Sequence, residues 1–113
     1  MEIRSNNKIY IIAPLSHKIS AYETIRLEKE IKTEANNKIV ALDLNNVSDC
    51  TIEFIEFLRN ISKKQTLGIF NISSDIFTLF NFMGIDKTAN LFTSELDFKE
   101  NSRKLINRNF CIV

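Results

Sequence analysis

The sequence has little of the residues that interrupt or crosslink a chain. Its 113 residues include two Gly, one Pro, two Cys and one His, and no Trp. So little Gly and Pro leaves no flexible linker, internal repeat or low-complexity segment, and we expect a single domain over residues 1–113. The two cysteines, Cys50 and Cys111, lie too far apart for a metal or redox motif, which indicates reduced thiols in the cytoplasm.

Charge and hydrophobicity are not concentrated anywhere in the chain. Fifteen Lys and Arg nearly balance fourteen Asp and Glu, so no charge excess favours nucleic acid or an anionic membrane as a partner. The longest early apolar run, residues 9–15, contains Pro14 and is too short to cross a bilayer. The sequence therefore predicts a cytoplasmic protein that does not insert directly into a membrane.

Familiar catalytic and ligand-binding signatures are also missing. There is no glycine-rich phosphate loop, and His17 has no partners for a zinc site or a catalytic triad. Glu53 and Glu56 lie three residues apart on a predicted solvated helix face, where Glu56 can pair with Arg59. We expect no metal and no cofactor.

What the chain does have is a buried strand that leads through a polar hinge into an amphipathic helix. Residues 39–44 form an apolar run with one carboxylate, typical of a strand buried on both faces. Asn45 and Asn46 favour a turn. Helical spacing then predicts a helix over 51–64, with its apolar positions at Phe54, Phe57, Leu58 and Ile61. Function in α/β sheets gathers at the carboxyl ends of strands, so we expect any site at residues 48–51.

The other segments alternate in the same way. Strands are predicted at residues 8–13, 67–72 and 91–92, with a loop over 15–18, and residues 1–7 are either a frayed arm or a first strand. Helices are predicted from a capping box at Ser20 to about residue 35, from residues 73–75 to Gly84, and over 95–108. The first helix should bury Ala21, Thr24, Ile25, Leu27 and Ile31. The last should use Leu96, Lys99, Arg103 and Ile106. This alternation predicts an α/β sheet that contains parallel strands.

The hinge carries the residues of most chemical interest. Asp49, Cys50 and Thr51 should cap the helix 51–64, where the helix dipole favours negative charge. A thiol there can have a lowered pKa, and a hydroxyl there can carry a phosphate. The alternative is that Asp49 or Thr51 is simply an N-cap and Cys50 a small buried filler.

Three stretches together resemble a known family. Residues 42–49 read Leu-Asp-Leu-Asn-Asn-Val-Ser-Asp, which is similar to the strand and loop before an Asp-Ser-Ser/Thr-Gly motif. Residues 70–73 and 77–86 resemble that family's next strand end and following helix, including Met83-Gly84-Ile85-Asp86. Residues 10–31 resemble its opening strand, loop and first helix. The chain is therefore identified as similar to the STAS domain, shared by bacterial anti-sigma factor antagonists and sulfate transporter tails.

The resemblance implies a single α/β domain with a central mixed sheet of four to five strands and about four helices, packed mainly on one face. It implies a protein-interaction module without catalysis. In the antagonist branch, an ATP-dependent kinase that is also an anti-sigma factor phosphorylates the Ser after the motif Asp. The resulting charge blocks docking by repulsion and desolvation.

Carried over by position, Asp49 is kept, Cys50 replaces the phosphoacceptor Ser, and Ile52 replaces the motif Gly. Thr51 is a possible alternative acceptor, and Ser48 is a weaker one. The resemblance places partner binding at Asp49, Glu53 and Glu56.

Three functions follow as hypotheses. The first is an antagonist-type module that docks an anti-sigma kinase through residues 48–60, with the phosphoswitch lost or moved to Thr51. The second is a constitutive scaffold subunit of a lipid-transport or stressosome-like assembly. The third is a redox sensor at Cys50. The sequence leaves open whether Phe77 and Phe82 belong to the core or to a docking patch.

Overall fold

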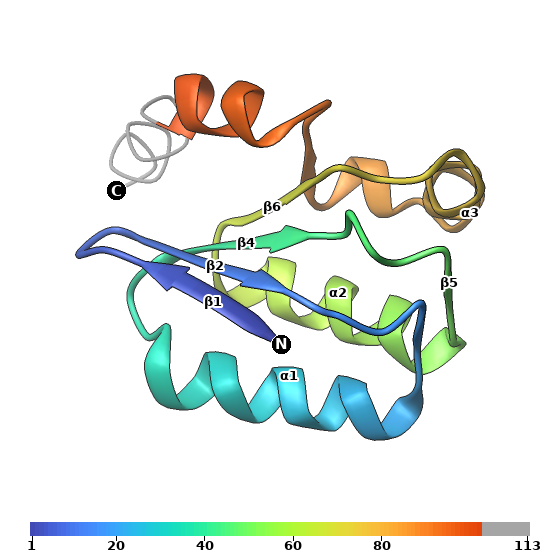
Figure 1. Ribbon diagram of the computed structural model, residues 1–113, viewed down its shortest axis with the longest axis horizontal. Coiled ribbons are helices and arrows are strands. Elements are labelled where there is room, and N and C mark those ends of the chain that lie inside the picture. Colours follow the sequence, from blue (N-terminus) through green and yellow to red (C-terminus); the bar gives the residue numbers. More distant parts are fainter. Residues whose placement is uncertain (103–113) are drawn as a thin grey trace.

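The computed structural model describes residues 1–102, and its centre is a mixed five-stranded sheet in the order β1-β2-β4-β6-β7 (Figure 1). Only β1 runs antiparallel to its neighbour β2; the other neighbouring strands are parallel. The strands are β1 (Glu2–Ser5), β2 (Ile9–Ala13), β4 (Ile39–Asp43), β6 (Leu67–Phe70) and β7 (Asn90–Leu91). A two-stranded sheet joins β3 (Lys18–Ile19) to β5 (Asp49–Cys50). The N-terminal residues thus form an edge strand, one of the two predicted alternatives.

Helices cover both faces of the five-stranded sheet unequally. Figure 1 shows α1 and α2 side by side on one face and the helical residues 95–102 on the other. The helices are α1 (Ala21–Glu34), α2 (Ile52–Lys64), α3 (Ser74–Met83) and the short 3-10 helix η1 (Ile85–Lys87). Helices α1, α2 and α3 share one apolar core. The predicted fold class, a mixed sheet with helices mainly on one face, is confirmed.

Strand β4 is buried on both faces, as its apolar run predicts. Val40 and Leu42 point into the core beneath α1 and α2. Ile39 and Ala41 point the other way, into a smaller cluster with Phe98. Successive side chains of a strand alternate between faces, so a run of apolar residues serves two layers at once.

Helix α1 begins as predicted but buries a narrower stripe. The hydroxyl of Ser20 accepts a hydrogen bond from the Glu23 amide at 3.2 Å, which caps the helix. Thr24, Leu27 and Ile31 are buried. The prediction that Ile25 faces the core is wrong: its side chain is 67% exposed, because one residue after Thr24 it is rotated about 100° away from the buried stripe.

Helices α2 and α3 follow their predicted patterns closely. The four predicted apolar positions of α2 are buried, and Ile55 joins them. Ser73 caps α3 by accepting from the Ile76 amide at 3.3 Å. Gly84 ends α3 with φ 76°, and Ile85 packs back into the core with no exposed surface.

The final helix differs most from its predicted pattern. Residues 95–102 are helical, while Arg103, Ile106 and Cys111 lie outside the described residues. Leu96 is 66% exposed and Lys99 is exposed, whereas the buried residue is Phe98. Phe98 stacks on Phe70 and meets Phe92 edge-on, so a small aromatic cluster holds residues 95–102 against the sheet, whereas Leu96 and Lys99 of the predicted stripe do not.

Candidate partner-docking site

The segment between β4 and α2 is held by backbone bonds to the segment before α1. The carbonyl of His17 accepts from the amides of Ser48 at 2.8 Å and Asp49 at 3.1 Å, and the Thr51 amide donates to the Ile19 carbonyl at 3.1 Å. Because β3 leads into α1 and β5 into α2, this small sheet places the two helix starts next to each other (Figure 1). The hinge is therefore an ordered surface.

The predicted partner-binding residues all face solvent at this end of the molecule. Asp49, Glu53 and Glu56 are exposed, and so are Ser48 and Ile52. Glu53 and Glu56 are one helical turn apart, which puts both carboxylates on the outer side of α2. The structure thus brings the predicted residues together into one accessible, acidic surface.

Asp49 is oriented by local contacts. Its Oδ1 accepts from the Cys50 amide at 2.8 Å, and its Oδ2 lies 3.8 Å from Lys18 Nζ. Both side chains of this ion pair are more than 60% exposed, so solvent screens it and it contributes little to stability. Asp49 therefore keeps a carboxylate available at the surface and does not cap α2, contrary to one of the predicted alternatives.

Thr51 occupies the N-cap position of α2 without using its side chain. No side-chain cap bond forms, and its Oγ1 is buried without a partner among the described residues. Ser20 and Ser73 do cap their helices, so the expected hydroxyl cap is absent only at α2 among the three. A buried hydroxyl is less accessible to a kinase than the exposed hydroxyl of Ser48.

Cys50 is half-buried and packs against the main core. Burial, and then the nearby Asp49 carboxylate, raise the pKa of its thiol to about 11. Reactive cysteines need a lowered pKa, because the thiolate is the nucleophile. This setting weighs against a redox sensor and fits the small buried filler.

Helix α3 flanks the hinge on the side away from α1. It lies against β5, and the guanidinium of Arg59 in α2 donates to the carbonyl of Met83 at the end of α3. The predicted ion pair between Arg59 and Glu56 is wrong: within residues 1–102 these two side chains form no ion pair, and Arg59 links α2 to α3 instead. Phe77 and Phe82 are both exposed, Phe82 to 85%, so neither is a core residue.

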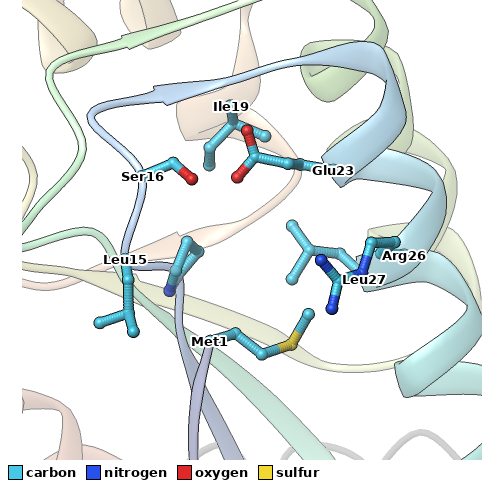
Figure 2. Close-up of a pocket in the computed structure, with 8 residues that line it drawn as sticks. Met1, Leu15, Ser16, Ile19, Glu23, Arg26 and Leu27 are labelled. Atoms are coloured by element: carbon cyan, nitrogen blue, oxygen red, sulfur yellow. The ribbon is translucent and has the colours of Figure 1, made fainter.

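The hollow beside α1 is too small to be a small-molecule site. This hollow has a volume of about 80 Å³. Figure 2 shows Glu23, Arg26 and Leu27 of α1 on one side of it and Met1 and Leu15 on the other. It is far smaller than the few hundred Å³ of a usual small-molecule site. Within the described part of the chain, no cluster of His, Cys, Asp or Glu could hold a metal ion, and no helix is long and apolar enough to cross a membrane.

The sequence did not reveal β3 and β5. Each is two residues long, too short to show an alternating pattern in the sequence, which instead predicts a loop over residues 15–18. In β3 the exposed Lys18 is followed by the fully buried Ile19, and in β5 the exposed Asp49 is followed by the half-buried Cys50, so each strand shows one step of alternation. The pairing matters because it brings Lys18 to Asp49 and α1 to the start of α2.

Comparisons with known proteins place this geometry in a recognised fold. No family model and no curated protein matches the sequence. A putative anti-sigma factor antagonist from Thermotoga maritima superposes with TM-score 0.78 and 13% identity, over 90% of this chain and 93% of that one. The anti-sigma factor antagonist SpoIIAA in its unphosphorylated form gives TM-score 0.67 and 9% identity, over 94% and 96%. A chain of the stressosome, described as a signal integration and transduction hub, gives 0.68 and 13%, over 93% and 98%.

These similarities span nearly the whole length of each protein, at identities that establish the fold alone. The resemblance seen in the sequence motifs is therefore confirmed in three dimensions. This chain has the STAS-like α/β fold of the anti-sigma factor antagonists.

Proposed function

We propose that this protein is a non-catalytic interaction module of the anti-sigma factor antagonist type, acting in the bacterial cytoplasm. The observation that carries the proposal is the exposed, acidic surface formed by Asp49, Glu53 and Glu56 at the start of α2. Backbone bonds to β3 hold this surface in place, so a partner meets a pre-organised edge. Its partner is an anti-sigma factor with serine kinase-like ATPase character.

The regulation of this surface differs from a phosphoserine switch. Cys50 occupies the acceptor position and carries no hydroxyl, and the Thr51 hydroxyl is buried. Ser48 is exposed, its hydroxyl donating to the His17 carbonyl at 3.3 Å. If a phosphoswitch operates, Ser48 is the accessible acceptor, one residue before Asp49. Phosphate there adds charge to a surface already acidic, which penalises docking of the same partner.

The test is to capture the tagged protein from its own cells and to identify bound proteins and the modification state of residues 48–51 by mass spectrometry. The docking variant Asp49→Lys/Glu53→Lys should lose the partner. The control Glu100→Lys reverses an exposed charge on the helix of the opposite face and should retain it. Equal recovery of the partner with the docking variant contradicts the proposed surface.

The replacement of the phosphoacceptor Ser by Cys50 also favours a second function, that of a constitutive scaffold. Cys50 has no hydroxyl and the Thr51 hydroxyl is buried, so neither residue offers an accessible phosphoacceptor. This suits a scaffold that binds constitutively within a lipid-transport or stressosome-like assembly. Capture then yields transporter or scaffold subunits, with residues 48–51 unmodified under every growth condition. Capture of a kinase together with phosphate at Ser48 excludes this reading.

A further inference from the structure

In the first turns of α1 and α2, exposed side chains of opposite charge lie on the outer faces, although Glu28 and Lys32 of α1 and Lys63 and Lys64 of α2 are exposed as well. On α1, Arg26 and Lys29 are exposed; on α2, Glu53 and Glu56 are exposed. Among residues 1–102, no ion pair involves any of these four side chains. Two basic side chains of α1 (the basic stripe) therefore lie beside two acidic side chains of α2 (the acidic stripe), and none of the four forms an ion pair within that part of the chain.

Exposed apolar side chains lie at the same end of these two stripes. Tyr22 is 70% exposed, Ile25 67% and Ile52 53%. In α1, Tyr22, Arg26 and Lys29 are spaced four and three residues apart, which puts them on one face. In α2, Ile52 and Glu56 are four apart, so apolar and acidic groups share one face as well. Clustered exposed apolar residues with a charged rim mark interaction surfaces.

The two stripes are also level with each other. Ile19 pairs with Cys50 in β3 and β5, and the two helices begin directly afterwards and run side by side in the same direction (Figure 1). Arg26 follows Ile19 by seven residues and Glu56 follows Cys50 by six. At 1.5 Å per residue, these side chains lie within about one turn of each other along the helix direction.

We propose that this face binds a second copy of the same chain. A two-fold axis parallel to the helices sets α1 of one copy against α2 of the other at the same level. Arg26 and Lys29 then meet Glu53 and Glu56 of the partner copy, and the pairing is made twice. Tyr22 and Ile25 meet Ile52 of the other copy near the helix starts. The face is complementary to itself, which is what an isologous dimer requires.

This dimer goes beyond the proposed docking function and competes with it. Glu53 and Glu56 belong to both surfaces, so a dimer keeps the docking residues covered until a partner displaces the second copy. Arg26 and Lys29 belong to the dimer face alone. Their replacement should therefore remove the dimer while leaving the docking residues free.

The test is a charge exchange followed by sedimentation equilibrium. The wild-type mass should rise from 13.1 kDa towards twice that value with concentration up to about 1 mM, and less so at high salt. Arg26→Glu/Lys29→Glu and Glu53→Lys/Glu56→Lys should each stay monomeric, because each presents like charges to its own copy. Mixed in equal amounts, the two variants should form a heterodimer, because both pairings are then opposite in charge.

Controls separate this proposal from the docking function. Lys8→Glu and Glu100→Lys each reverse one exposed charge away from the α1–α2 face and should dimerise like wild type. A wild-type monomer at every concentration overturns the proposal, as does a dimer that both exchanges leave intact or a mixture that stays monomeric. Partner capture by Arg26→Glu/Lys29→Glu reports on docking alone, so either idea can fail without the other.

Discussion

Arg4 and Glu95 lie 91 residues apart in sequence and are joined by a 2.6 Å hydrogen bond from Nη1 to Oε2. Arg4 also reaches Asp43 at 3.4 Å, and Glu95 accepts from Lys99 at 2.8 Å. The edge strand β1, the end of β4 and the helix at 95–102 are thus connected by one network of charges. The network ties the helix at 95–102 to the sheet, on the face opposite α1 and α2.

This network predicts a pH-dependent contribution from Glu95. Hydrogen bonds from Lys99 and then Arg4 lower the pKa of its carboxyl. A lowered folded-state pKa gives stability that is present above the unfolded value of about 4.3 and is lost as the pH falls through the folded value. Glu95→Gln should therefore cost up to about 1 kcal/mol at neutral pH, since the pairs are partly exposed and screened.

Urea unfolding at several pH values measures this difference. The curves of wild type and Glu95→Gln should converge as the pH falls below about 4. A gap of the same size at pH 3 and pH 7 would show that the variant loses packing and not charge.

Gly68 predicts a second stability effect on the same face. A Cβ at this position would lie 2.8 Å from Phe98 Cε1 and 3.3 Å from Phe92 Cε2. Gly68→Ala should destabilise the protein by about 1–3 kcal/mol, because the aromatic cluster must shift. Urea unfolding of Gly68→Ala, Phe98→Leu and the double variant should show that the double loses less than the sum. Simple additivity would mean that Phe98 does not occupy this space.

Replacing Thr51 should maintain or raise the free energy of unfolding, whereas Gly68→Ala should lower it. Its Oγ1 is buried without a partner among the described residues, so Thr51→Val removes an unsatisfied group of nearly the same shape. The variant should be neutral or more stable by up to about 1 kcal/mol. Ser73→Ala is the matched control and should lose about 1 kcal/mol, because that hydroxyl does cap its helix. Equal losses in the two variants would show that Thr51 caps α2 in solution.

Cys50 should be slow to react. The thiol pKa of about 11 leaves Cys50 protonated at neutral pH. Because this pKa is higher than the unfolded chain's value of about 8.5, the thiol contributes fully to the free energy of unfolding below about pH 8.5, and the contribution is lost as the pH rises towards the folded-state pKa. In a Cys111→Ser background, alkylation at pH 8 should be at least about 10-fold slower than in the denatured chain, because the thiolate reacts. Fast alkylation of the folded protein would restore the redox hypothesis.

The elements that sequence predicted well are those whose signals are local. Ser20, Ser73 and Gly84 each act within one helical turn, and the apolar spacing of α2 is long enough to define its buried face. Contacts over long sequence distances were not predictable in this way. The pairing of Ile19 with Cys50, the burial of Phe98 and the exposure of Ile25 depend on which elements meet, and no local pattern determines that.

The candidate site shows the same division. Glu53 and Glu56 could be placed on the outer face of α2 from the helical period alone, whereas Asp49 was expected at the docking surface only from the family resemblance. The pairing of β3 with β5 buries the Thr51 hydroxyl and brings Lys18 to Asp49. This pairing could not be predicted, because strands of two residues have no recognisable pattern in the sequence.

The central claim is that a protein partner docks on residues 48–60. Hydrogen exchange of the protein, alone and bound to the partner that it captures from its own cells, tests this most directly. We predict that the amides of residues 48–60 exchange more slowly in the bound protein than in the free protein. The exchange rates of the helix at 95–102, on the opposite face of the sheet, should not change. Protection confined to residues 95–102 or to β1, with residues 48–60 exchanging as in the free protein, would contradict the claim.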